Sequence, residues 1–208
     1  SGAITLCVRE SSGALGYTLG DGKFVGFHTE MAENIVRDMQ KNLGLAKLDI
    51  KYQPVTSQNR IPLVTNGTVD LECGSTTNDL NRQKEVDFAN TTYVEQVRIA
   101  VRKDSNIKDV DDLNGKTVAT TTGTTSVQLL RQSKRGGNID FKNILGKDHA
   151  DSFLLLESGR ADAFVMDGQI LAGNSATAKN PADFKIVGEV LSVEPIASMV
   201  RKDDPGIK

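Results

Sequence analysis

Short apolar runs that suit β-strands alternate along this chain with stretches of helical periodicity. One stretch places apolar side chains four residues apart, at Met31, Ile35, Met39 and Leu43, and it ends at Gly44, a residue typical of helix C-termini. This spacing predicts an amphipathic helix. In the first half of the chain we also predict a short helix at 60–65, strands at 4–8, 48–52 and 69–72, and a strand or turn at 24–27.

The same alternation restarts near residue 97. There we predict a helical turn at 110–113, helices at 127–132, 151–157 and 168–178, and strands at 97–101, 117–120, 139–145, 163–166, 184–187 and 196–200. Both halves read βαβαβ, an order that favours parallel sheets covered by helices. The sequence therefore predicts an α/β protein with two three-layer α/β/α lobes that meet at a ligand cleft, with functional loops at the carboxyl ends of strands.

Composition narrows the class of protein. A length of 208 residues allows one large domain or two small ones. The net charge of -2 and the 5% aromatic content predict that nucleic acid is not a partner. No run approaches the ~18 apolar residues of a membrane-spanning helix. The chain opens with Ser1, Gly2 and Ala3, from which we expect a mature or trimmed start.

The two cysteines, Cys7 and Cys73, each end an apolar run. We interpret them as small buried apolar residues. A disulfide between them would need Cα atoms within about 7 Å, which the sequence leaves open.

Candidate chemistry centres on arginines that follow strand-like runs. Arg60 closes the segment TSQNR, Arg82 follows the segment CGSTTNDLN, and Arg9 comes directly after the first strand. A guanidinium donates two parallel hydrogen bonds to a carboxylate, and neighbouring hydroxyl groups serve the remaining lone pairs. These clusters predict a site for an anionic small molecule, and two of them suit two carboxylates.

Three further segments offer polar groups at helix starts. Residues 122–126 (TGTTS) lead into a helix and form either an anion seat or an ordinary N-cap. His149 is either a surface residue of a capping segment or a donor to an acidic ligand group. Asp167, at the end of a buried strand, either caps the next helix or pairs with a ligand ammonium group.

Support for catalysis is weak. The chain has no Gly-x-Ser-x-Gly segment and only two histidines, one of which, His28, lies at a predicted helix start. No spacing typical of metal ligands occurs. We therefore predict no catalytic residue, no metal site and no cofactor.

Taken together, the segments at 56–63, 72–78, 123–126, 147–153 and 156–161 resemble the glutamate/aspartate periplasmic binding proteins of ABC transporters (solute-binding proteins, family 3). The resemblance implies the type II periplasmic binding fold, in which two lobes close on a ligand. It places the first lobe at 1–93 plus 196–208, the second at 97–190, and the crossovers near 94–97 and 191–195. It also implies that further helices of the first lobe follow residue 208.

The same resemblance implies roles for individual residues. The ligand side-chain carboxylate would contact Arg9, Ser57, Arg60 and Ser75. The α-carboxylate would contact Thr77 and Arg82, with help from Thr124 and Thr125. The ligand ammonium would pair with Asp167, with His149 nearby.

The resemblance further implies a monomeric, periplasmic protein that is not an enzyme and that delivers its ligand to the membrane subunits of a transporter. Two departures leave the ligand open: the segment GALG at 13–16 stands where the family has a Pro-aromatic pair, and Pro195-Ile196 replaces a small-aromatic pair. Alternatives are 4-aminobutyrate or another amino acid, a piece of an engineered sensor, a receptor's sensing domain, and a dehydratase-like enzyme using Glu10 or His149.

Overall fold

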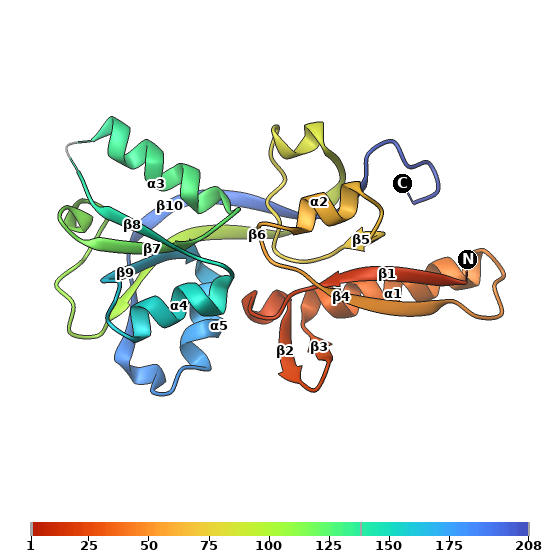
Figure 1. The fold of residues 1–208 in the computed structure, drawn as a ribbon, viewed down its shortest axis with the longest axis horizontal. Helices are drawn as coiled ribbons and strands as arrows, with labels where there is room; N and C mark the ends of the chain where they lie inside the picture. The colour runs from red at the N-terminus through yellow and green to blue at the C-terminus, as the bar shows by residue number, and fades with distance from the viewer. Residues whose placement is uncertain (1, 138, 208) are drawn as a thin grey trace. The chain divides into compact units, whose positions relative to one another are not determined.

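The chain divides into two compact units (Figure 1). The computed structural model describes residues 2–137 and 139–207. Ser1 and Lys208, the outer limits of the predicted first lobe, lie outside the described residues, as does Asn138. Unit 1 comprises Ser1–Tyr93 and Pro195–Lys208, and unit 2 comprises Val94–Glu194. None of the helices in the described ranges combines the length and hydropathy that a membrane crossing requires.

Unit 1 has a sheet between two helical layers. Its elements are β1 (Ala3–Val8), η1 (Gly13–Leu15), β2 (Tyr17–Gly20), β3 (Lys23–Val25), α1 (Phe27–Asn42), β4 (Asp49–Pro54), α2 (Arg60–Thr65), β5 (Leu71–Glu72) and η2 (Arg82–Lys84). Strand β1 lies between β4 and β5 and is parallel to both. Ile4 and Leu6 of β1 pack with α1, whereas Cys7 packs on the opposite face with Val64 of α2. The period-two alternation of β1 thus supplies both cores.

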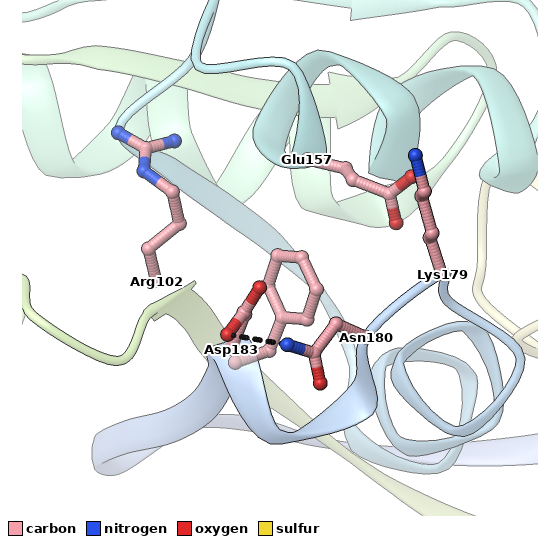
Figure 2. Close-up of a pocket in the computed structure, with 6 residues that line it drawn as sticks. Arg102, Glu157, Lys179, Asn180 and Asp183 are labelled. Atoms are coloured by element: carbon pink, nitrogen blue, oxygen red, sulfur yellow. Dashed lines mark hydrogen bonds between the residues drawn. The ribbon is translucent and has the colours of Figure 1, made fainter.

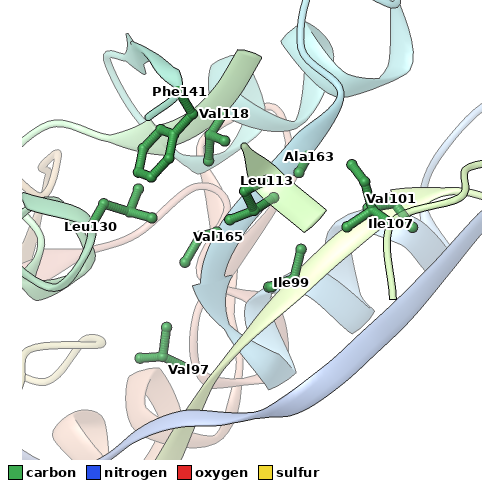
Figure 3. Packing of buried hydrophobic residues seen from close by; sticks show 10 residues of the cluster. All are labelled: Val97, Ile99, Val101, Ile107, Leu113, Val118, Leu130, Phe141, Ala163 and Val165. Atoms are coloured by element: carbon green, nitrogen blue, oxygen red, sulfur yellow. The ribbon is translucent and has the colours of Figure 1, made fainter. Parts of the chain in front are cut away.

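Unit 2 repeats this three-layer plan. Its elements are η3 (Asp111–Leu113), β7 (Thr117–Thr121), α3 (Thr125–Gly136), β8 (Lys142–Gly146), α4 (His149–Glu157), β9 (Ala163–Asp167), α5 (Gly168–Ala176) and η4 (Pro181–Asp183). Strand β7 is parallel to β8 and β9. Ala163 and Val165 of β9 belong to the same apolar cluster as Leu130 of α3 (Figure 3). Phe164 and Met166 face α4 and α5. The predicted α/β fold class is confirmed.

Two long strands, β6 (Val86–Arg102) and β10 (Phe184–Arg201), run through both units. The strand order is β4-β1-β5-β10-β6-β9-β7-β8, with β10 antiparallel to β5 and β6 antiparallel to β9. The prediction of parallel sheets therefore holds for β4, β1 and β5 and for β9, β7 and β8, and it is wrong for β6 and β10. The predicted start of a strand at 97 and the split of 184–200 into two strands are also wrong. Residues 89–94 of β6 are exposed and mostly polar, so they carry no apolar period.

The hairpin of β2 and β3 was not predicted, although residues 24–27 were assigned to a strand or turn. All four residues of β2 are exposed, and so they lack the alternation that marks a half-buried strand. Asp21 and Gly22 form the turn with φ of 52° and 73°. This left-handed backbone suits a two-residue hairpin loop, and Asp-Gly is a preferred sequence for it.

Cys7 and Cys73 are buried and free. They lie on neighbouring strand paths but on opposite faces of the unit 1 sheet: Cys73 packs with α1 and Cys7 with α2. Side chains on opposite faces do not present their sulfur atoms to each other. The interpretation of both as buried apolar residues agrees with their exposure of 3% each.

We predict that both thiols resist modification in the native protein. Burial raises the pKa of Cys7 well above its ordinary value and that of Cys73 to about 12, so the reactive thiolate is scarce at pH 8. A disulfide-exchange reagent should react slowly with the native protein and then titrate two thiols after denaturation without reductant. Finding no thiol in the denatured, unreduced protein would contradict the free state.

Candidate functional site

Arg9 is the centre of the polar cluster in unit 1. It follows β1 directly, and its side chain is 1% exposed. The guanidinium donates from Nη2 to Ser57 Oγ at 2.8 Å and from Nη1 to Ser75 Oγ at 3.3 Å. Ser12 Oγ lies 2.8 Å from Ser75 Oγ. The structure therefore brings together three predicted site residues from segments that are far apart in the sequence.

Arg60 is the second buried cation of unit 1. It is the first residue of α2 and is 2% exposed. Its charge and that of Arg9 both lower the pKa of Cys7, although burial and the carboxylate of Glu72 raise that pKa by more. Coulombic effects on one thiol place all three charged groups in its neighbourhood. Formally, this cluster holds two cations and one anion.

Glu72 was missed by the sequence analysis. It is fully buried, and its Oε1 accepts a hydrogen bond from Thr76 Oγ1 at 3.1 Å. A Cβ at residue 74 would collide with the Glu72 carboxylate and press on Arg9 Cγ, so Gly74 lets the loop cross directly over both. We name residues 72–77 the anchor loop. Only the absence of a side chain at Gly74 signals this packing in the sequence.

Arg82 lies at the end of the same polar region. It donates from Nη1 to the carbonyl of Thr77 at 2.9 Å. Asp79, another residue missed by the sequence analysis, accepts the Arg82 backbone N–H at 2.9 Å, and its Oδ2 lies 3.7 Å from Arg82 Nε. Asp79 therefore orients Arg82 from both backbone and side chain.

In unit 2, Thr121 is the hub of a second cluster. Its Oγ1 lies 2.9 Å from His149 Nδ1 and 2.8 Å from Ser152 Oγ. His149 is 1% exposed at the start of α4, so its interpretation as a surface histidine is wrong. Thr121 lay between the predicted strand at 117–120 and the candidate segment at 122–126 and was not predicted, because a threonine after a β run carries no signal of its own.

Thr124 and Thr125 lie at the start of α3. Thr124 occupies the N-cap position, and its Oγ1 donates to the carbonyl of Thr121 at 2.7 Å instead of capping the helix. An N-cap hydroxyl in the ordinary role would accept from a first-turn N–H. The first turn of α3 thus begins without a side-chain cap, as an anion seat requires.

Asp167 ends β9 and is 5% exposed. It occupies the N-cap position of α5, but its side chain makes no capping hydrogen bond. Close by in unit 2, Glu95 of β6 is 2% exposed, and its Oε1 accepts N–H groups from Gln96 at 3.1 Å and Gln169 at 3.4 Å. The start of α5 thus has two carboxylates near it, of which Glu95 was not predicted.

The ten predicted site residues fall into one group in each unit. Unit 1 holds Arg9, Ser57, Arg60, Ser75, Thr77 and Arg82, and unit 2 holds Thr124, Thr125, His149 and Asp167. In both units they follow the carboxyl ends of parallel strands or begin the next helix. The group in unit 1 contains three arginines, whereas the group in unit 2 contains the carboxylate of Asp167.

Comparison with known proteins identifies the family. Residues 4–208 match the family model of bacterial extracellular solute-binding proteins, family 3. This chain belongs to that family. The resemblance predicted from its motifs is confirmed. This family-3 chain is 46% identical over 208 residues to the glutamate/aspartate import solute-binding protein of Salmonella typhimurium, covering all of this chain and 69% of that protein.

Two further comparisons place this family-3 chain. It is 46% identical over 210 residues to the L-glutamate/L-aspartate-binding protein of Pseudomonas aeruginosa, again covering all of this chain and 69% of that protein. A solved structure of an ancestral arginine-binding protein bound to arginine matches with a TM-score of 0.84 and 30% identity. That match covers 98% of this chain and 86% of the other.

Two pockets lie apart from the predicted residues of this family-3 chain. In unit 2 a hollow of about 510 Å³ is lined by Arg102, Glu157, Lys179, Asn180, Asp183 and Phe184, as Figure 2 shows. Asn180 donates to Asp183 there at 3.0 Å, and the opposed charges give no net preference for an anion or a cation. In unit 1 an apolar groove of about 530 Å³ runs beside α1 and β6. Within the described residues, no group of three or more His, Cys, Asp or Glu side chains could hold a metal ion.

We predict that Glu95→Gln stabilises the protein more at pH 7 than at pH 4. Burial is the main cause that raises the pKa of Glu95, and the nearby Glu194 adds to it, while hydrogen bonds lower it. The native state therefore holds this proton to higher pH than the unfolded chain does, so rising pH through this window lowers native stability. Glutamine removes that dependence.

The measurement is the free energy of denaturant unfolding of both proteins at the two pH values. Glu189→Gln, at an exposed position of β10, is the matched control for loss of a negative charge. A Glu95→Gln effect of equal size at pH 4 and pH 7 would count against a buried, titrating carboxyl group.

Proposed function

We propose that this chain binds an acidic amino acid, glutamate or aspartate, and delivers it to an ABC importer. The observation that carries the proposal is the pair of buried arginines, Arg9 and Arg60, in a hydroxyl-rich setting in unit 1. Burial makes a guanidinium costly unless anionic partners and hydrogen bonds compensate it. A ligand carboxylate is a suitable partner for a cluster whose formal charge is positive.

The arginines also bear on which amino acid is bound. The solved ancestral protein is bound to arginine, whose side chain is cationic. A cationic side chain would meet the charges of Arg9 and Arg60, and like charges in a buried site repel strongly. The two relatives with 46% identity carry glutamate and aspartate in their names. Charge and similarity thus favour the acidic ligands.

The remaining groups suit the backbone of an amino acid. Arg82 and Thr77, with the uncapped start of α3 at Thr124 and Thr125, would take the α-carboxylate. Asp167 would take the ammonium group, with His149 adding a hydrogen bond. A ligand that engages both sets favours the closed conformation in proportion to its differential affinity for the two states. The membrane subunits of the transporter would recognise this closed, ligand-bound conformation.

The proposal assigns binding without chemical turnover. The polar groups of both units serve as hydrogen-bond and charge partners for a whole ligand, and the family consists of solute-binding proteins. We place the protein outside the cytoplasmic membrane, in the periplasm, acting as a monomer. The domain limits inferred from the resemblance, 1–93 plus 196–208 and 97–190, belong to the same proposal.

We predict that L-glutamate or L-aspartate binds best and that Arg60→Ala weakens binding at least about 100-fold. Loss of a charge-assisted bidentate contact costs on the order of 3 kcal/mol, and each 1.4 kcal/mol is a factor of ten. The affinity of Arg60→Lys should lie between those of the wild type and Arg60→Ala, because lysine keeps the positive charge but cannot donate two parallel hydrogen bonds. Calorimetric titration with both acids, L-glutamine, L-arginine and 4-aminobutyrate measures this.

Arg131→Ala, at an exposed position of α3, is the matched control and should bind like the wild type. Preference for 4-aminobutyrate or a neutral amino acid, with Arg60→Ala binding normally, would refute the acidic specificity. Failure of all five compounds to bind would refute the proposed function.

A further inference from the structure

His28 is a buried histidine with no role among the proposed ligand contacts. It is the second residue of α1 and is 1% exposed. Gly26 is the N-cap of α1; its φ is 128°, and a Cβ there would collide with the carbonyl of Leu15. This close approach fixes the start of α1 and therefore the place from which the imidazole of His28 extends.

Both ring nitrogens of His28 make hydrogen bonds. Nδ1 lies 2.6 Å from the carbonyl oxygen of Gly74, and Nε2 lies 3.0 Å from Thr92 Oγ1. A carbonyl oxygen only accepts, so Nδ1 must carry a hydrogen. Nε2 of the neutral ring then accepts from the Thr92 hydroxyl, whose single hydrogen is shared between this nitrogen and the carbonyl oxygen of Ile196.

Thr92 extends this chain of contacts to the second long strand. Its Oγ1 also lies 3.3 Å from the carbonyl oxygen of Ile196. Thr92 lies on β6 immediately before Tyr93, the last residue of the first segment of unit 1, and Ile196 is the second residue of the returning segment. The hydrogen bonds therefore reach the backbone where the chain leaves unit 1 and where it returns.

The other end of the chain of contacts is the anchor loop. Gly74 lies between Glu72, which is buried beside Arg9, and Ser75, whose hydroxyl accepts from Arg9. The carbonyl that His28 contacts thus belongs to the loop that supplies Ser75 and Thr77. A shift of this carbonyl moves the partners of both Arg9 and Arg82.

We propose that His28 is a positioning residue that couples the anchor loop to the two connecting strands through Thr92. This inference rests on the proposed function. The contacts Gly74–His28–Thr92–Ile196 would link ligand binding in unit 1 to the backbone conformation of β6 and β10, where the chain leaves and re-enters this unit. Thr92 allows an experiment to distinguish this coupling role from a purely structural role of His28. Among the described residues the Thr92 side chain hydrogen-bonds His28 and Ile196, neither of which is a proposed ligand contact, and it lies on an exposed stretch of β6.

The test is a double-mutant cycle of His28→Asn and Thr92→Val in the full protein, read as affinity for L-glutamate. The amide nitrogen of asparagine can occupy the place of Nδ1 and keep the Gly74 contact, whereas the contact to Thr92 is lost. We expect each single variant to weaken binding about 2- to 10-fold, the range for one net hydrogen bond, and the double variant to be no weaker than either. The loss should lie in a faster dissociation rate constant, measured by stopped flow.

Controls separate the possible failures. Thr91→Val makes the same change one residue away on β6, where the threonine side chain has no hydrogen bond to another described residue, and it should bind like the wild type. His28→Gln cannot restore the Nδ1 contact to Gly74 and should bind more weakly than His28→Asn. Unfolding free energies of all variants are measured without ligand.

Three results would overturn the inference. Normal affinity in Thr92→Val, or additive losses in the cycle, would show that the two residues do not act together. Lower unfolding free energy with unchanged affinity and dissociation rate would show a purely structural role. If wild type binds L-glutamate and Arg60→Ala does not, the proposed function stands whatever the cycle shows; if wild type binds none of the amino acids, both proposals fall.

Discussion

The burial of two guanidinium groups constrains the rest of unit 1. Among the described residues, Arg9 and Arg60 have the largest side chains that are fully buried. Such burial is tolerated only where polar partners replace water. Ser57 and Ser75 accept from Arg9, and the carboxylate of Glu72, the first residue of the anchor loop, lies against Gly74. The absence of a side chain at Gly74 is therefore a consequence of charge compensation below the loop.

Most of the fold and the candidate site follow from local rules that sequence displays. The helical period of α1 and the apolar runs of β1, β7 and β9 predicted elements that the structure contains. Because parallel strands share one carboxyl edge, residues such as Arg9 and Asp167 could be assigned to functional loops before any coordinates. The arginines and Asp167 were singled out by their positions after strands, whereas Ser57, Ser75 and Thr77 were assigned individually on the family resemblance. The contacts of both groups within each unit required the structure.

The failures arise where the decisive contacts are remote in sequence. The exposed half of β6 is a strand because it belongs to a long ladder, and its own residues carry no period. Glu72 and Glu95 look like ordinary strand residues, yet both are buried. His28 showed only as a helix start, although its partners lie 46 and 64 residues away. Single-residue patterns do not encode partners at that separation.

The discontinuity of unit 1 has a consequence for biosynthesis. Unit 2 is one contiguous segment, so all of its residues emerge from the ribosome in a single run. Unit 1 cannot complete its sheet at that stage, because β5 pairs with Met199 and Val200. Until those residues emerge, the two-residue strand β5 has an open edge, and open edges are sites of mispairing. During translation the first segment of unit 1 must therefore remain partly folded until unit 2 and the returning strand β10 have been synthesised.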